Sequence, residues 1–183
     1  MNKETIFDDI SIMGRVAYII FSIETYLKEN EDNEKWNILL DALWSFTEFD
    51  KCIDDYAYKV IECTPDCILD EREDFTTFDY FNEKELNEFK DLYTESEYTK
   101  TIDYLMEQIN EILACNLYTS VKPPEIYSLN IINETYLYIK QLLGEKTPST
   151  EPFRIYSIYE HTCWGDCTLG KDVLLEQMNS LKS

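Results

Sequence analysis

Apolar residues recur every three or four positions through the first thirty residues, which is the spacing of one face of an α-helix. We predict this helix over residues 5–29. Its stripe consists of Ile6, Ile10, Met13, Val16, Ile20, Ile23 and Leu27. A stripe of this width is typical of an amphipathic helix that faces a core.

Two further helical stripes follow, and one straight helix cannot bury both. The first runs from Trp36 to Thr47 and the second from Ile53 to Cys63. At 100° per residue, the second stripe lies about 120° away from the first. We therefore predict that the chain kinks or turns near Asp50, and Pro65 prevents the second helix from simply continuing.

Residues 64–82 show no sustained period and predict a long loop with short local turns. Asn82 and Glu85 then resemble a capping box that opens a helix. The apolar spacing indicates another helix around residues 102–112. Pro123 and Pro124 are expected to open a further helix, which Gly144 ends.

The remaining residues predict a linker and a small C-terminal unit. Residues 145–152 contain two prolines, residues 153–159 fit either a strand or a helix, and a short helix closes the chain. Six or seven helices with little or no sheet predict an all-α fold, an irregular bundle. We expect one helical domain over residues 1–183, with 145–152 linking it to an appendage at 153–183.

The composition indicates a folded, strongly acidic protein. The 183 residues fit a single domain. There are 37 acidic and 16 basic residues, so the net charge is −21, while 44% of the chain is hydrophobic. That apolar content excludes a disordered acidic tail. The charge excludes direct binding to nucleic acid or to an anionic membrane, because both would repel the protein.

The chain lacks the residues that several common active sites need. Its four glycines are Gly14, Gly144, Gly165 and Gly170, and they cannot form the clustered glycines of a phosphate-binding loop. A single histidine, His161, excludes paired-histidine metal sites. We therefore expect no enzymatic activity and no cofactor.

Two cysteine pairs leave a zinc site as an alternative. Cys63 and Cys67 form one pair, and Cys163 and Cys167 follow His161. Three residues separate the members of each pair, whereas zinc knuckles commonly use two. The N-terminus also lacks a basic, apolar signal peptide, so we expect a cytoplasmic protein with reduced thiols. Buried packing is favoured for these cysteines, and any further role stays open.

The negative charge is concentrated in the early middle of the chain. Residues 31–95 hold 20 acids and 6 bases, a net charge of −14, whereas residues 96–183 have a net charge of −5. Such crowding costs stability through repulsion. It fits either a solvated surface or a patch that meets a basic partner, and the two readings remain open.

Helix geometry indicates where a partner would contact this region. Trp44 lies between the core stripe and the acids of its helix, and Tyr58 lies among acids on the next helix. An aromatic side chain surrounded by charges is typical of an interface anchor, although both could equally be ordinary core or half-exposed residues. The candidate partner-binding residues are Asp41, Trp44, Glu48, Asp54, Asp55, Tyr58, Glu62, Asp70, Glu71, Glu73 and Asp74.

The chain resembles the immunity proteins of bacterial polymorphic toxin systems, in particular the mostly helical immunity protein 6 family. The resemblance rests on the helical order, on the tryptophan-bearing second helix (Ala42-Leu43-Trp44) and on the Trp164-Gly165 turn. It implies a non-enzymatic inhibitor, monomeric or homodimeric, that binds one cognate toxin domain. A nuclease toxin carries a basic groove that an acidic surface can occupy. The alternative is a nucleic-acid-mimicking regulator that binds basic DNA- or RNA-binding proteins.

Overall fold

The computed structural model describes residues 6–30, 33–49, 53–70, 75–117, 121–123, 125–160 and 163–182. Its α-helices are α1 (Ile12–Asn30), α2 (Asn37–Trp44), α3 (Ile53–Glu62), α4 (Pro65–Ile68), α5 (Glu83–Glu95), α6 (Thr99–Ala114), α7 (Ile126–Leu143) and α8 (Lys171–Ser180). The described ranges contain no β-strand, only an isolated bridge between Ile10 and Ser157. The predicted all-α fold is therefore confirmed, and the described residues form eight α-helices, close to the number expected.

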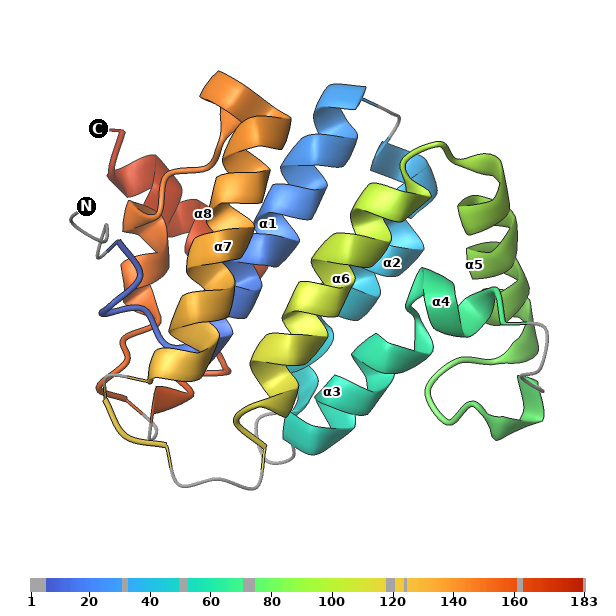
Figure 1. Ribbon diagram of the computed structural model, residues 1–183, viewed down its shortest axis with the longest axis horizontal. Coiled ribbons are helices and arrows are strands. Elements are labelled where there is room, and N and C mark those ends of the chain that lie inside the picture. Colours follow the sequence, from blue (N-terminus) through green and yellow to red (C-terminus); the bar gives the residue numbers. More distant parts are fainter. Residues whose placement is uncertain are drawn as a thin grey trace.

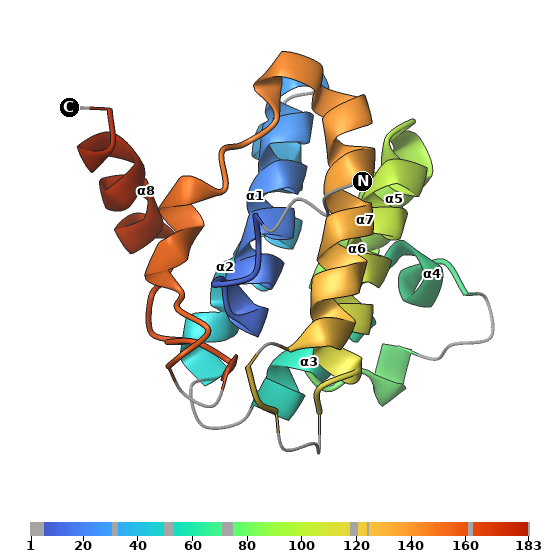
Figure 2. The same cartoon turned by 60° about the vertical axis from the view of Figure 1, so that its left-hand side comes forward.

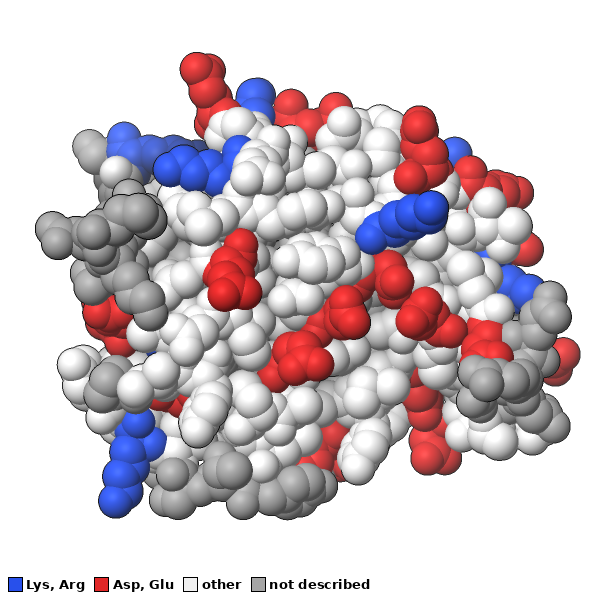
Figure 3. Space-filling model, viewed as in Figure 1, with Lys and Arg blue, Asp and Glu red and all other residues white. Residues whose placement is uncertain are grey.

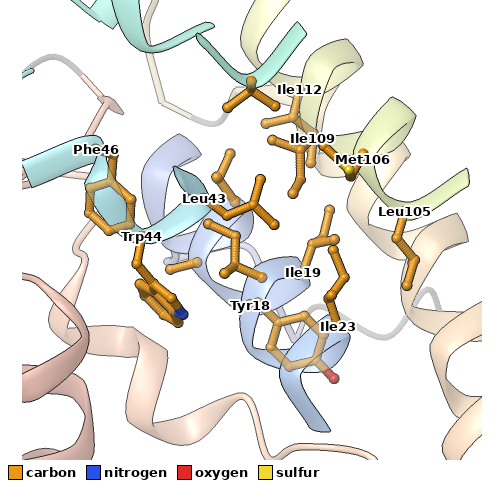
Figure 4. Packing of buried hydrophobic residues seen from close by; sticks show 14 of the residues in the cluster. Tyr18, Ile19, Ile23, Leu43, Trp44, Phe46, Leu105, Met106, Ile109 and Ile112 are labelled. Atoms are coloured by element: carbon orange, nitrogen blue, oxygen red, sulfur yellow. The ribbon is translucent and has the colours of Figure 1, made fainter. Parts of the chain in front are cut away.

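Helix α1 forms the centre of the bundle. Thirteen of its nineteen residues are buried, and it packs against α2, α6 and α7. Figure 1 shows α7, α1 and α6 side by side, with α2 behind α6. The apolar side chains of α1, α2 and α6 meet in one cluster, where Leu43 lies among Ile19, Ile23 and Ile109 (Figure 4). The helix predicted at the start of the chain is thus buried on several sides, and its apolar stripe is only part of the buried surface.

The first helix begins later than its apolar pattern indicated. Residues 6–10 form turns, and α1 begins at Ile12, although Ile10 is still fully buried. The Ser11 hydroxyl accepts a hydrogen bond from the amide of Gly14 at 3.2 Å and caps the helix. The backbone amide of Ser11 donates to the carbonyl of Tyr156 at 2.8 Å. Hydrogen bonds to residues far along the chain therefore make α1 begin later than its apolar pattern predicts.

Helices α2 and α3 are separate, as the two stripes required. A 3₁₀ helix, η2 (Ser45–Phe49), tightens the chain after α2, and α3 starts at Ile53. Asp50, where we predicted the turn, lies outside the described residues. The hydroxyl of Tyr56 donates to the carbonyl of Leu43 at 2.7 Å and joins α3 back to α2. Both apolar stripes, on two separate helices, thus contribute to the same core.

The predicted loop at 64–82 contains more regular structure than its pattern indicated. Pro65 opens the one-turn helix α4, and the hydroxyl of Thr64 caps it by accepting from the amide of Cys67 at 3.3 Å. A 3₁₀ helix, η3 (Phe75–Thr77), follows. The capping box that opens α5 is confirmed, because the side chains of Asn82 and Glu85 each accept from the other residue's amide.

A buried ion pair fixes the start of α7 against α1. The N-cap of α7 is Glu125 rather than a proline, and Pro124 lies outside the described residues. Arg15 is 0% exposed, and its Nη1 donates to Oε2 of Glu125 at 2.8 Å and to the hydroxyl of Ser128 at 2.6 Å. Burial lowers the pKa of Arg15, and the Glu125 carboxylate opposes this shift. Gly144 ends α7 with a positive φ of 55°, as predicted.

The segment after α7 packs directly onto α1. Residues 144–146 and 151–155 form two short 3₁₀ helices, η4 and η5. The hydroxyl of Tyr18 donates to the carbonyl of Pro148 at 3.1 Å, and the rings of Tyr18 and Phe153 meet edge to face at 5.1 Å. The ambiguous stretch 153–159 is thus part 3₁₀ helix and part turn. The boundary between a main domain and an appendage stays a prediction.

Helix α8 closes the chain at one side of the bundle, away from α4 (Figure 2). It packs mainly against η5, its Lys171 pairs with Glu24 of α1 at 2.8 Å, and Leu174 is its one buried residue. No helix of the described residues combines the length and the apolar character that crossing a membrane requires.

Candidate functional site

The structure places Trp44 in the core rather than at a surface. Its side chain is 8% exposed and lies against Phe46, with ring centroids 5.9 Å apart. The indole N–H donates to Oε2 of Glu24 on α1 at 3.4 Å. Trp44 therefore does not serve as an exposed anchor. Asp41 and Glu48, from the same segment, are both exposed, and Glu48 lies 4.0 Å from the ammonium group of Lys59 on α3.

Tyr58 on α3 is 53% exposed, but two of the acids beside it have partners within the chain. The carboxylate of Glu62 accepts from the amides of Asp79 at 2.8 Å and Tyr80 at 2.9 Å. The hydroxyl of Tyr80 donates to Asp55 at 3.3 Å. Glu62 and Asp55 thus attach the segment before α5 to α3, and Glu62 has both oxygens engaged. Asp54 is half-buried on the same helix.

The aromatic residues of this segment pack onto the bundle. The ring of Tyr80 lies edge to face with Phe49 at 6.2 Å, and Phe81 does the same with Phe89 at 5.1 Å. Burial, and next the Asp55 carboxylate, raise the pKa of Tyr80 to about 12, so its phenol stays protonated and can donate. Of the four candidate acids in the preceding loop, Asp70 is described, and Glu71, Glu73 and Asp74 lie outside the described residues.

Asp70 belongs to a groove that the sequence pattern did not indicate. The groove lies between α4, the end of α5 and the start of α6, and its volume is about 870 Å³. In Figure 1, α4 lies between α5 and α6, and both helices contact it. The lining consists of Pro65, Asp66, Leu69, Asp70, Tyr93, Ser96, Glu97, Thr99, Lys100 and Asp103. Four carboxylates and one ammonium group therefore surround a partly apolar floor.

The carboxylates of this groove are crowded. The backbone amide of Asp66 favours the charged form of the Asp103 carboxylate. Burial, which has the largest effect, and the negative charges of Asp66 and Glu107 all disfavour ionisation. Together they outweigh the amide, so the pKa of Asp103 is raised above its ordinary value. No ion pair among the described residues involves Asp66 or Asp103. An incoming cation would relieve this repulsion.

Acidic residues continue from the groove along α6. Asp103, Glu107 and Glu111 are spaced four residues apart, so they share one face of the helix. Figure 3 shows a diagonal row of acidic side chains over α6 and towards α4. Residues 97–111 hold four acids and one base, whereas residues 121–182 hold eight acids and six bases. The negative charge of the second half of the chain is thus concentrated at its start.

The basic residues are engaged mostly on the opposite side of the bundle. Arg154 pairs with Asp9 and Glu151, and Lys171 pairs with Glu24 at 2.8 Å. These pairs join the C-terminal segment to α1 and to the residues before it. On the side formed by α3, α4 and α6, Lys59 pairs with Glu48 at 4.0 Å, and no acid of α4 or α6 is in an ion pair among the described residues.

The cysteines are mainly packing residues in the described part of the chain. Cys63 is fully buried, its thiol donates to the carbonyl of Val60 at 3.4 Å, and burial raises its pKa. Cys163 is 1% exposed, whereas Cys67 and Cys167 are half-buried. The described residues contain no group of three His, Cys, Asp or Glu side chains arranged to hold a metal ion. His161 lies outside the described residues.

The acidic surface of α2, α3, α4 and α6 is therefore the candidate functional site. It combines the exposed Asp41, Glu48 and Tyr58 with the carboxylate-lined groove. Comparisons with known protein families, with curated proteins and with solved structures find no match.

Proposed function

We propose that this protein is a non-enzymatic immunity protein that binds a cognate bacterial toxin domain and neutralises it. The target is a basic domain, for which a nuclease is the best candidate. The protein would occupy its active-site cleft or an essential surface next to it. The observation that carries the proposal is the carboxylate-lined groove on a side of the molecule that keeps its negative charge.

The physical reason lies in what a nuclease needs. Its substrate is a polyanion, so its active site is surrounded by lysine and arginine side chains. An acidic inhibitor meets the same side chains, and opposite fields accelerate the encounter. Tyr58 supports this reading, because an exposed ring among carboxylates adds apolar contact at low entropic cost.

The first test is whether a secreted protein that ends in a compact basic domain is encoded next to this chain; that domain is then purified for the binding and inhibition experiments. We expect one equivalent of the protein to abolish the toxicity of that domain and, if it is a nuclease, its cleavage of nucleic acid. Reversing the charges of the exposed Asp41 and Glu48 and of the half-buried Asp54 to lysine should slow association by about ten-fold and flatten its dependence on salt. A domain that is neither bound nor inhibited would refute the proposal.

Tyr58→Ala provides the complementary variant. Since Tyr58 is uncharged, its loss should raise the dissociation rate and leave the salt dependence of association unchanged. If the protein instead binds many unrelated nucleic-acid-binding proteins with similar affinity, the nucleic-acid-mimicking regulator replaces the immunity function. Specificity for one partner is what separates the two.

A further inference from the structure

We propose that the groove between α4, α5 and α6 is the docking site for a segment of the protein partner that presents a lysine or arginine side chain beside an aliphatic one. This inference rests on the proposed function, and it names the contact through which the partner is held. None of the groove's residues except Asp70 was among the candidates from the sequence.

The charge of the groove requires a cation. Asp66, Glu97 and Asp103 line it, and the exposed Lys100 makes no ion pair among the described residues. Asp103 is half-buried and next to other carboxylates, which disfavours its charged form. A basic side chain placed between Asp66 and Asp103 would compensate both carboxylates in one position.

The apolar part of the groove requires more than a free cation. Pro65, Leu69 and Tyr93 form this part, and Leu69 is 39% exposed. Tyr93 is 3% exposed and its hydroxyl donates to the carbonyl of Cys63 at 2.5 Å, and Pro65 is buried, so Leu69 is the exposed apolar side chain of the groove. On α3, which contacts α4, Ile61 is also exposed, at 44%. Exposed aliphatic carbon next to carboxylates favours an amphipathic, basic segment over a metal ion or a small polyamine.

The size of the groove fits the same occupant. A volume of about 870 Å³ is near the upper end of the range for ligand pockets, so it has room for several side chains. The groove is also open, which lets a continuous chain pass through it. A segment in which a basic residue follows an aliphatic one by three or four positions would place both groups on one face of a helix.

The test uses a synthetic helical peptide of leucine and lysine, labelled with a fluorophore, and the full-length protein at low ionic strength. A matched peptide carries glutamine in place of lysine. We expect the lysine peptide to bind and the glutamine peptide to bind at least ten-fold more weakly. Amide chemical shifts should change at the groove residues Leu69, Ser96 and Lys100 rather than along α8.

Matched variants separate the groove from net charge. Asp66→Asn combined with Asp103→Asn removes two charges from the groove, and Glu145→Gln combined with Glu176→Gln removes two exposed charges from η4 and α8. The groove variant should bind the lysine peptide about ten-fold more weakly, and the control less than about two-fold. Circular dichroism should show both variants folded.

Two outcomes overturn the inference. Equal weakening by both variants would show that the peptide binds through net charge alone, and no binding to the unmodified protein would remove the site. Either result leaves the proposed function standing, because a toxin domain can still be inhibited through α2 and α3. Peptide binding in the groove without inhibition of the toxin domain would refute the proposed function alone.

Discussion

Replacing Glu125 with alanine should destabilise the fold strongly, because this carboxylate has two roles. It compensates the fully buried guanidinium of Arg15, and it caps α7 by accepting from the amides of Tyr127 at 2.6 Å and Ser128 at 2.9 Å. Without Glu125, Arg15 would stay buried beside the carbonyls of Phe7 and residue 125, and its Nε has no hydrogen-bond partner among the described residues. The variant thus leaves an uncompensated charge in the core.

The magnitude follows from the burial of the pair. Removing one partner of a buried ion pair costs about 3–5 kcal/mol, and loss of an N-cap about 1 kcal/mol. These costs share the same hydrogen bonds and do not simply add. We expect the free energy of unfolding to fall by about 4 kcal/mol, which lowers Tm by about 8–16 °C in a protein of this size.

Urea unfolding, followed by circular dichroism and by the fluorescence of the buried Trp36 and Trp44, measures this loss. Glu134→Ala is the matched control, because Glu134 is exposed on the same helix, and it should change the free energy by less than about 0.5 kcal/mol. Arg15→Met should recover part of the loss when combined with Glu125→Ala. If Glu125→Ala were as mild as the control, the reasoning about the buried pair would be wrong.

Three further changes test other parts of the structure by the same unfolding measurement. Burial and nearby carboxylates raise the pKa of Asp103, so its negative charge destabilises the fold at pH values above that pKa. Asp103→Asn should therefore raise the free energy of unfolding by about 0.5 kcal/mol at pH 7. A stabilisation that persists well below about pH 4, where the carboxyl group is neutral in both states, would contradict this. Gly14→Ala should cost about 1–3 kcal/mol, since its Cβ would lie 2.6 Å from Ile10 and 2.7 Å from Tyr156. Trp44→Ala should lower the free energy of unfolding by about 3–5 kcal/mol and Tyr58→Ala by less than about 0.5 kcal/mol, because Trp44 is buried and Tyr58 is exposed. Equal losses would contradict this difference in burial.

Local sequence signals predicted those parts of the fold that local interactions determine. The capping box at Asn82 and Glu85 was predicted to the residue, because both hydrogen bonds lie within four residues of chain. Gly144 was placed correctly for the same reason. The start of α1 was predicted several residues too early, because Tyr156 and Trp164 accept the hydrogen bonds that fix it.

The candidate site was less accessible to sequence reasoning. Helix geometry gave the angle of Trp44 on α2, but the side chains that cover it come from other elements, such as Glu24 on α1. Likewise, Glu62 lies on the outward side of α3, and only the fold brings the amides of residues 79 and 80 to it. Carboxylates on a helix surface can hold their own chain as readily as a partner.

The groove had one signal that the sequence analysis missed. Asp103, Glu107 and Glu111 repeat every four residues on the face opposite the apolar stripe of α6. Counting charge over residues 96–183 as one segment averaged this row with the nearly neutral C-terminal part. The approach of α4 to α6, which makes the row part of a groove, depends on tertiary packing and has no signature in either segment.

The hydrogen bonds that join the start of α1 to residues 156 and 164 have a consequence for biosynthesis. Amides of Ser11 and Met13 donate to carbonyls of Tyr156 and Trp164, and Phe153 and Tyr156 are fully buried. A nascent chain therefore cannot complete the surroundings of α1 until Tyr156 and Trp164 have left the ribosome. Such long-range closure slows folding and leaves apolar surface uncovered during translation. The residues of α1 thus depend on residues 153–164, which are made much later, to shield them from aggregation.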